Sequence, residues 1–161
     1  MKLTVTTDGI ENIAADLLAL PLSKRALEKD AEKALSGLGL ALGVLKDFKA
    51  DAGEMTLLYG TGGKCAAARI ALLGIGEGNS PDDWRKAAGA LASKAVELQL
   101  SRLGADLSGV IPVAGVPGHS FLQLASVFVQ GCLAGSYRFE RLKSGKLEKP
   151  EKKKSPKKKK E

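Results

Sequence analysis

The sequence has few of the residues that build cross-linked or metal-bound scaffolds. It contains two cysteines, Cys65 and Cys132, and a single histidine, His119. Two cysteines so far apart in sequence indicate neither a disulfide framework nor a zinc-ligand cluster, so we expect two reduced thiols. The first residues lack the apolar core of a secretory signal, and the apolar stretch at 121–134 is shorter than the ~20 residues of a membrane span. These absences favour a cytoplasmic protein with no membrane partner.

Common catalytic motifs are also missing. The chain has no His-Glu-x-x-His, Cys-x-x-Cys or Gly-x-Ser-x-Gly pattern. His119 has no second histidine and no carboxylate at ligand spacing, so we interpret it as a helix cap or a surface residue rather than a catalytic one. We therefore assign no catalytic, cofactor-binding or metal-binding residue to this chain.

Positive charge is concentrated at one end of the chain. The formal net charge is +7, from 25 Lys and Arg residues against 18 Asp and Glu residues. Residues 141–161 hold 11 Lys and Arg residues against 3 Glu residues, which gives +8 and leaves −1 (14 against 15) for residues 1–140. The body of the protein is therefore nearly neutral, and the basic character belongs to the tail.

The lysine-rich tail has two interpretations. Its lysines could bind nucleic-acid phosphates in a salt-dependent and sequence-independent way. It has no aromatic side chain to stack on bases, however, and Leu147 is its only large apolar residue after Leu142. Such a segment cannot offset the entropy of ordering, so we expect residues 144–161 to be a disordered linker, with DNA binding as the alternative.

The remaining residues, 1–143, are enough for one domain with a single core. Alternation predicts a strand at 3–7, and a continuous apolar run predicts a central strand at 14–21 that Pro21 would end. Apolar residues at three- and four-residue spacing predict an amphipathic helix over 27–45, with a break near Gly37. Residues 55–59 and 65–73 then form the two arms of a predicted β-hairpin.

The segment from residue 69 to 113 is predicted to form a strand, a helix and a second strand. Two parallel strands joined by a helix bury both faces of a sheet, so we expect the rest of the chain to pack around this unit. Ser80 caps the predicted helix at 82–103, whose buried stripe begins at Trp84. A return strand is predicted at 106–113. A further helix at 121–135 is apolar almost all round, so we expect it to be buried.

Two glycine-rich loops resemble phosphate-binding loops. Gly74, Gly76 and Gly78 follow a strand and precede the capped helix, but Asn79 stands where a dinucleotide fingerprint needs its third glycine. We favour a tight structural turn there, with a nucleotide or ADP-ribose site as the alternative. The loop at 60–64 departs from a phosphate loop at Leu58 and Cys65, so we favour a hairpin loop.

Three segments together resemble the N-terminal domain of the cytosol (leucyl) aminopeptidase family. They are Ala-Arg-Ile-Ala-Leu-Leu-Gly-Ile-Gly at 68–76, Trp-Arg-Lys-Ala-Ala-Gly-Ala at 84–90 and Gly-Cys-Leu-Ala-Gly-Ser-Tyr-Arg-Phe at 131–139. The likeness extends over nearly all of residues 1–143, and the third segment is its most specific part. These segments are packing motifs and carry no chemistry.

The resemblance implies a fold, a domain organisation and a role. The expected fold is a macro-domain-like α/β three-layer sandwich, a mixed β-sheet with helices on both faces, over residues 1–143. Family members continue into a C-terminal catalytic domain that holds two divalent metal ions, zinc or manganese, and removes N-terminal residues from peptides. The Asn-Thr-Asp-Ala-Glu-Gly-Arg sequence of that domain is absent from these 161 residues. We therefore expect no cofactor in this chain.

The same resemblance implies partners. We expect a non-catalytic assembly or regulatory domain that packs on the catalytic domain of the same protein, within a homo-hexamer. Some bacterial family members also bind DNA, a role to which the basic tail could contribute. The end of the chain at Glu161, inside a lysine-rich linker, suggests a fragment of a longer protein.

Overall fold

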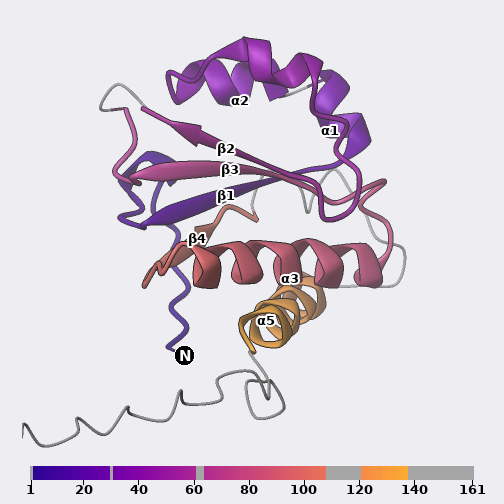
Figure 1. The fold of residues 1–161 in the computed structure, drawn as a ribbon. Helices are drawn as coiled ribbons and strands as arrows, with labels where there is room; N and C mark the ends of the chain where they lie inside the picture. Colours follow the sequence, from indigo (N-terminus) through magenta and orange to yellow (C-terminus); the bar gives the residue numbers. More distant parts are fainter. Residues whose placement is uncertain (1, 30, 61–63, 108–120, 138–161) are drawn as a thin grey trace, which may run out of the picture.

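A mixed β-sheet lies at the centre of the protein, with helices on both of its faces (Figure 1). The computed structural model describes residues 2–29, 31–60, 64–107 and 121–137. The sheet has the strand order β2-β3-β1-β4. Its strands are β1 (Leu17–Leu22), β2 (Met55–Tyr59), β3 (Arg69–Gly74) and β4 (Leu103–Ala105). β1 pairs in parallel with β3 and β4, whereas β2 pairs antiparallel with β3. The expected three-layer α/β sandwich is therefore confirmed.

The strand β1 is buried along its whole length, as its continuous apolar sequence predicts. It begins three residues later than predicted and passes through Pro21 to end at Leu22. Pro21 lacks an N–H, which costs a strand most where a neighbouring strand needs that donor. The described part of β4 ends at Ala105, opposite Ala19, so it needs no hydrogen bond from Pro21.

One face of the sheet is covered by short helices instead of the single helix predicted at 27–45. These are α1 (Lys24–Lys29), α2 (Ala31–Gly37) and the 3₁₀ helix η2 (Leu42–Lys46). The predicted break near Gly37 is confirmed. Gly39 adopts a left-handed φ of 70°, and the N–H of Leu40 donates to the carbonyl of Leu35 at 2.9 Å, which closes the end of α2.

The other face is covered by α3 (Pro81–Glu97), which begins at its predicted cap. The Ser80 hydroxyl accepts a hydrogen bond from the N–H of Asp82 at 3.2 Å. The helix ends six residues before the predicted position, because Gln99 adopts a left-handed φ of 55° and turns the chain into β4. The return strand is therefore earlier than predicted, and residues 108–113 of the predicted strand lie outside the described residues.

The last described helix, α5 (Phe121–Ser136), matches the predicted bounds to within one residue. It crosses α3 on the side away from the sheet (Figure 1). Phe128 packs edge-on against Trp84, with ring centroids 6.5 Å apart. The expectation of a buried helix holds only for the side toward α3, where Leu124 and Phe128 are buried. On the opposite face Leu122 is 76% exposed and Leu133 is 49% exposed.

The predicted strand at 3–7 is also wrong. These residues form no strand in the structure, and Leu3 and Val5 are 61% and 80% exposed. Alternation of apolar and polar residues is compatible with a strand but cannot supply the neighbouring strand that a ladder needs.

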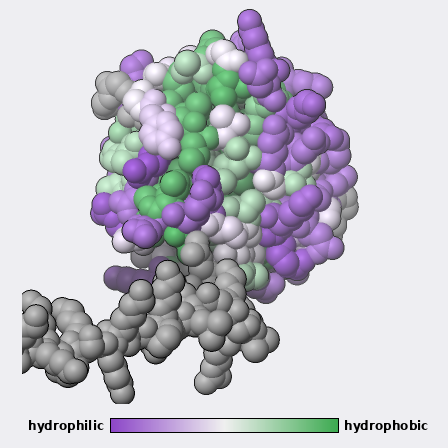
Figure 2. All heavy atoms as spheres, in the orientation of Figure 1, coloured by the Kyte–Doolittle hydropathy of each residue, from purple (hydrophilic) through white to green (hydrophobic). Residues whose placement is uncertain are grey.

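Figure 2 shows that hydrophobic side chains also reach the surface in a band across the face in view, beside a hydrophilic side. Within the described ranges, none of the helices is long and apolar enough to span a membrane.

Candidate functional site

The glycine-rich turn after β3 lies where the carboxyl ends of β1 and β3 meet, the usual ligand position in such sheets. The N–H groups of its three glycines are already bonded within the protein. The N–H of Gly74 donates to Glu54, that of Gly76 to Ala50 and that of Gly78 to Ile75, at 2.8, 2.8 and 3.0 Å between nitrogen and carbonyl oxygen. A phosphate-binding loop needs free N–H groups that point at the ligand, and the N–H groups of these three glycines are not free.

Packing and backbone geometry account for the three glycines. A Cβ atom on Gly74 would lie 2.7 Å from the carbonyl carbon of Ala50, so only glycine allows this close approach. Gly76 and Gly78 adopt φ values of 60° and 75°, which favour glycine. This geometry supports the structural-turn interpretation over the nucleotide-site interpretation.

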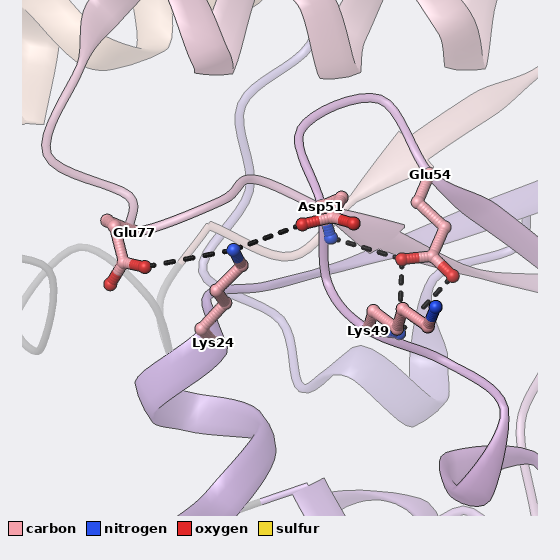
Figure 3. A network of polar contacts seen from close by, with 5 residues as sticks. All are labelled: Lys24, Lys49, Asp51, Glu54 and Glu77. Atoms are coloured by element: carbon pink, nitrogen blue, oxygen red, sulfur yellow. Dashed lines mark hydrogen bonds and ion pairs between the residues drawn. The ribbon is translucent and has the colours of Figure 1, made fainter.

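The charges beside this turn also disfavour an anionic ligand (Figure 3). The Lys24 ammonium lies 3.1 Å from the Asp51 carboxylate and 3.9 Å from that of Glu77. Hydrogen bonding and charge attraction from Asp51 raise the pKa of Lys24, with a smaller contribution from Glu77. Glu54 accepts hydrogen bonds from the backbone N–H groups of Lys49 and Asp51. The Lys24 ammonium is thus already paired with two carboxylates.

The described residues provide neither an activated thiol at Cys132 nor a metal site. Cys65 and Cys132 form no disulfide, as expected, and burial raises the pKa of Cys132 to about 11, which keeps it protonated near neutral pH. Among the described residues, no three His, Cys, Asp or Glu side chains are grouped to hold a metal ion. His119, residues 61–63 of the glycine loop and the lysine-rich tail lie outside the described residues. The antiparallel pairing of β2 with β3 confirms the predicted hairpin, although its second arm begins at Arg69 instead of residue 65.

The most specific feature of the structure is a close crossing of α3 and α5. A Cβ atom on Gly131 would lie 2.7 Å from the Cβ of Ala88, and one on Gly135 would lie 2.7 Å from the Cα of Gly89. The Ser93 hydroxyl donates a hydrogen bond to the carbonyl of Gly135 at 2.9 Å. Glycines four residues apart on α5 therefore let the two backbones touch.

This crossing brings together two of the segments that carry the family resemblance, residues 84–90 and the start of 131–139. The sequence predicted the helix at 121–135 but not which element would lie against it. Gly89, on an otherwise helix-favouring segment, was the available signal for α3 as the partner. The motif thus marks a packing site.

Comparisons with known proteins agree with the resemblance. The model of the cytosol aminopeptidase family, N-terminal domain, matches residues 9–146. A probable cytosol aminopeptidase of Chlorobium limicola is 48% identical over 149 residues, 92% of this chain and 30% of that protein. That of Chlorobaculum tepidum is 43% identical, over 94% of this chain and 30% of its own length. That of Desulfotalea psychrophila is 31% identical, over 84% of this chain and 28% of its own length.

A solved structure, the bottromycin maturation enzyme BotP in complex with Mn, shares the fold with a TM-score of 0.55 at 21% identity. That match covers 81% of this chain and 25% of the other. The chain spans about 30% of the length of the curated relatives that it matches most strongly. Neither a nucleic-acid-binding module nor a nucleotide-binding domain is favoured by these matches. The chain belongs to the cytosol aminopeptidase family and forms its N-terminal domain.

Proposed function

We propose that this chain is a non-catalytic assembly domain of a cytoplasmic aminopeptidase. The proposal rests on the part of the family that the chain matches. The chain matches the family's N-terminal domain and only about 30% of the length of its relatives. The internal bonding of the glycine turn at Gly76 and the pairing of Lys24 with Asp51 support a structural role for the sheet edge. Catalysis then belongs to the C-terminal part of the protein.

In this proposal, residues 1–143 form a macro-domain-like unit and residues 144–161 link it to the catalytic part. The described residues offer no donor set for a metal, so the two divalent ions, zinc or manganese, would be held by the C-terminal part. There they would activate water for hydrolysis of N-terminal peptide bonds. The complete protein is proposed to assemble as a homo-hexamer, to whose contacts this domain contributes.

An aminopeptidase assay tests the division of labour. The isolated chain, residues 1–161, is compared with a fusion protein. In the fusion protein, the Chlorobium limicola relative keeps its C-terminal part, and residues 1–161 replace the segment that they match. With leucyl nitroanilide and added Mn²⁺ or Zn²⁺, we expect turnover by the fusion protein and none by the isolated chain. Metal-dependent turnover by the isolated chain would contradict the proposal.

A further inference from the structure

The helix α5 has an exposed side that is unusually poor in charge. Its 16 residues include no Asp, Glu, Lys or Arg. Leu124, Phe128 and Gly131 face α3 and are buried. We define the outer face of α5 as the four residues that lie on the opposite side of the helix. They are Leu122, Ser126, Val129 and Leu133, at spacings of three and four residues.

The neighbouring helix shows what a solvent-facing helix looks like in this protein. The exposed positions of α3 carry charged or polar side chains. They are Asp82, Arg85, Lys86, Ser93 and Glu97. The exposed positions of α5 carry no charge, and besides Gln, Ser and Ala they include two leucines, Leu122 and Leu133, with the half-buried Val129 between them. Exposed leucines on a helix side without charge are unfavourable in water, which indicates that a further surface packs here.

We propose that the outer face of α5 is the docking surface for the C-terminal part of the same polypeptide, an inference that rests on the proposed function. About 70% of the length of the relatives lies outside what this chain matches, and the matched part is the family's N-terminal domain. The helix α5 is the last described element of that domain. An uncharged face with two exposed leucines fits an apolar, uncharged patch on the occupant.

The size of the face favours a tethered occupant over a second copy of the chain. Stable interfaces between separate proteins use about 20–30 residues on each side. Four side chains on one helix face are far fewer than that. A covalently linked domain has a high effective concentration, so even a small apolar face can be stably covered.

A single engineered thiol measures whether the face is covered. Ser126 is exposed at the centre of the outer face, so Ser126→Cys places a reactive thiol there, and Ser36→Cys on exposed α2 places a matched thiol on the opposite layer. Alkylation rates at each site are followed by mass spectrometry of the labelled peptides. From the isolated chain to the fusion protein, we expect the rate at position 126 to fall about tenfold or more. The rate at position 36 should stay within about twofold.

Introducing a charge provides the matched test of cause. In the fusion protein, Leu133→Asp should restore alkylation at position 126, whereas Leu42→Asp, at another exposed leucine on η2, should not. Equal alkylation of position 126 in the isolated chain and in a catalytically active fusion protein would overturn the docking surface but leave the proposed function standing. Protection that grows with the concentration of the isolated chain would also overturn it, because the occupant would then be a second copy. Peptidase activity of the isolated chain would instead overturn the proposed function.

Discussion

Asp16 shows how one residue at the start of a strand can join distant parts of the chain. It lies just before β1, and its carboxylate accepts hydrogen bonds from the backbone N–H groups of Ser101 and Arg102 at 3.0 and 2.9 Å. The Arg102 guanidinium lies 3.5 Å from the same carboxylate. These contacts hold the turn between α3 and β4 against the first strand. Sequence reasoning did not predict these contacts, because the two partners lie 85 and 86 residues away along the chain.

Acid should weaken this junction. The backbone N–H groups of Arg102 and then Ser101 lower the pKa of Asp16 below its ordinary 3.8. A carboxyl group whose pKa is lowered by folding stabilises the fold above its unfolded pKa, and that contribution is lost as pH falls through the folded pKa. We expect Asp16→Asn to lower the melting temperature at pH 7, and the difference from wild type to shrink at pH values below 3.8.

Thermal melts followed by circular dichroism at several pH values measure this effect. Glu28→Gln, at an exposed carboxylate on α1, removes the same charge away from the junction and should change the melting temperature less at pH 7. If Asp16→Asn and wild type melt together at pH 7, the carboxylate does not stabilise the turn before β4.

At the scale of elements, α3 and α5 depend on each other through their glycines. A Cβ atom on Gly131 would meet the Arg85 carbonyl and the Cβ of Ala88. Gly131→Ala should gain up to about 1 kcal/mol of helix propensity but lose about 1–3 kcal/mol to overpacking, so we expect a net loss of stability. Gly37→Ala, at the end of α2 with open space around it, should be neutral or stabilising.

Urea unfolding monitored by tryptophan fluorescence reports this crossing directly. Trp84 is the single tryptophan of the chain, is fully buried and packs against Phe128 of α5. A Gly131→Ala protein at least as stable as wild type would mean that the helices can separate at no cost, and that the glycine does not set their spacing.

The elements also show what sequence reasoning can reach. Local signals placed the start of α3 correctly, because Ser80 and Pro81 act within one turn of the helix. Its end was misplaced, because the left-handed turn at Gln99 has no glycine to announce it. The existence of α5 follows from its apolar composition, yet composition cannot say which side α3 covers. The exposure of Leu122 is therefore visible only in the structure.

The candidate site divides in the same way. Asn79 in place of a third glycine was enough to favour a structural turn at Gly74, Gly76 and Gly78. The reason for each glycine was not predictable, because the Ala50 backbone that approaches Gly74 comes from a separate loop. Likewise, the pairing of Lys24 with Asp51 joins two segments whose proximity only the mixed sheet creates.

In the whole molecule, the excess positive charge lies in the tail, whereas the apolar core lies in the preceding residues. We therefore predict that the tail can be removed without loss of the fold. Residues 144–161 contain 9 Lys and 3 Glu, a net charge of +6, and only Leu147 as a large apolar residue. A chain truncated after Lys143 should therefore keep the melting temperature of the full chain to within about 1 °C, because the tail adds almost no apolar area to the core. A drop of several degrees would show that the tail packs on the domain and would move the proposed boundary.

Fluorescence anisotropy with a DNA duplex at two salt concentrations tests whether the tail binds nucleic acid. For a linker we expect no tight binding by either protein near physiological salt, whereas steeply salt-dependent binding that disappears on truncation would assign the tail a nucleic-acid partner.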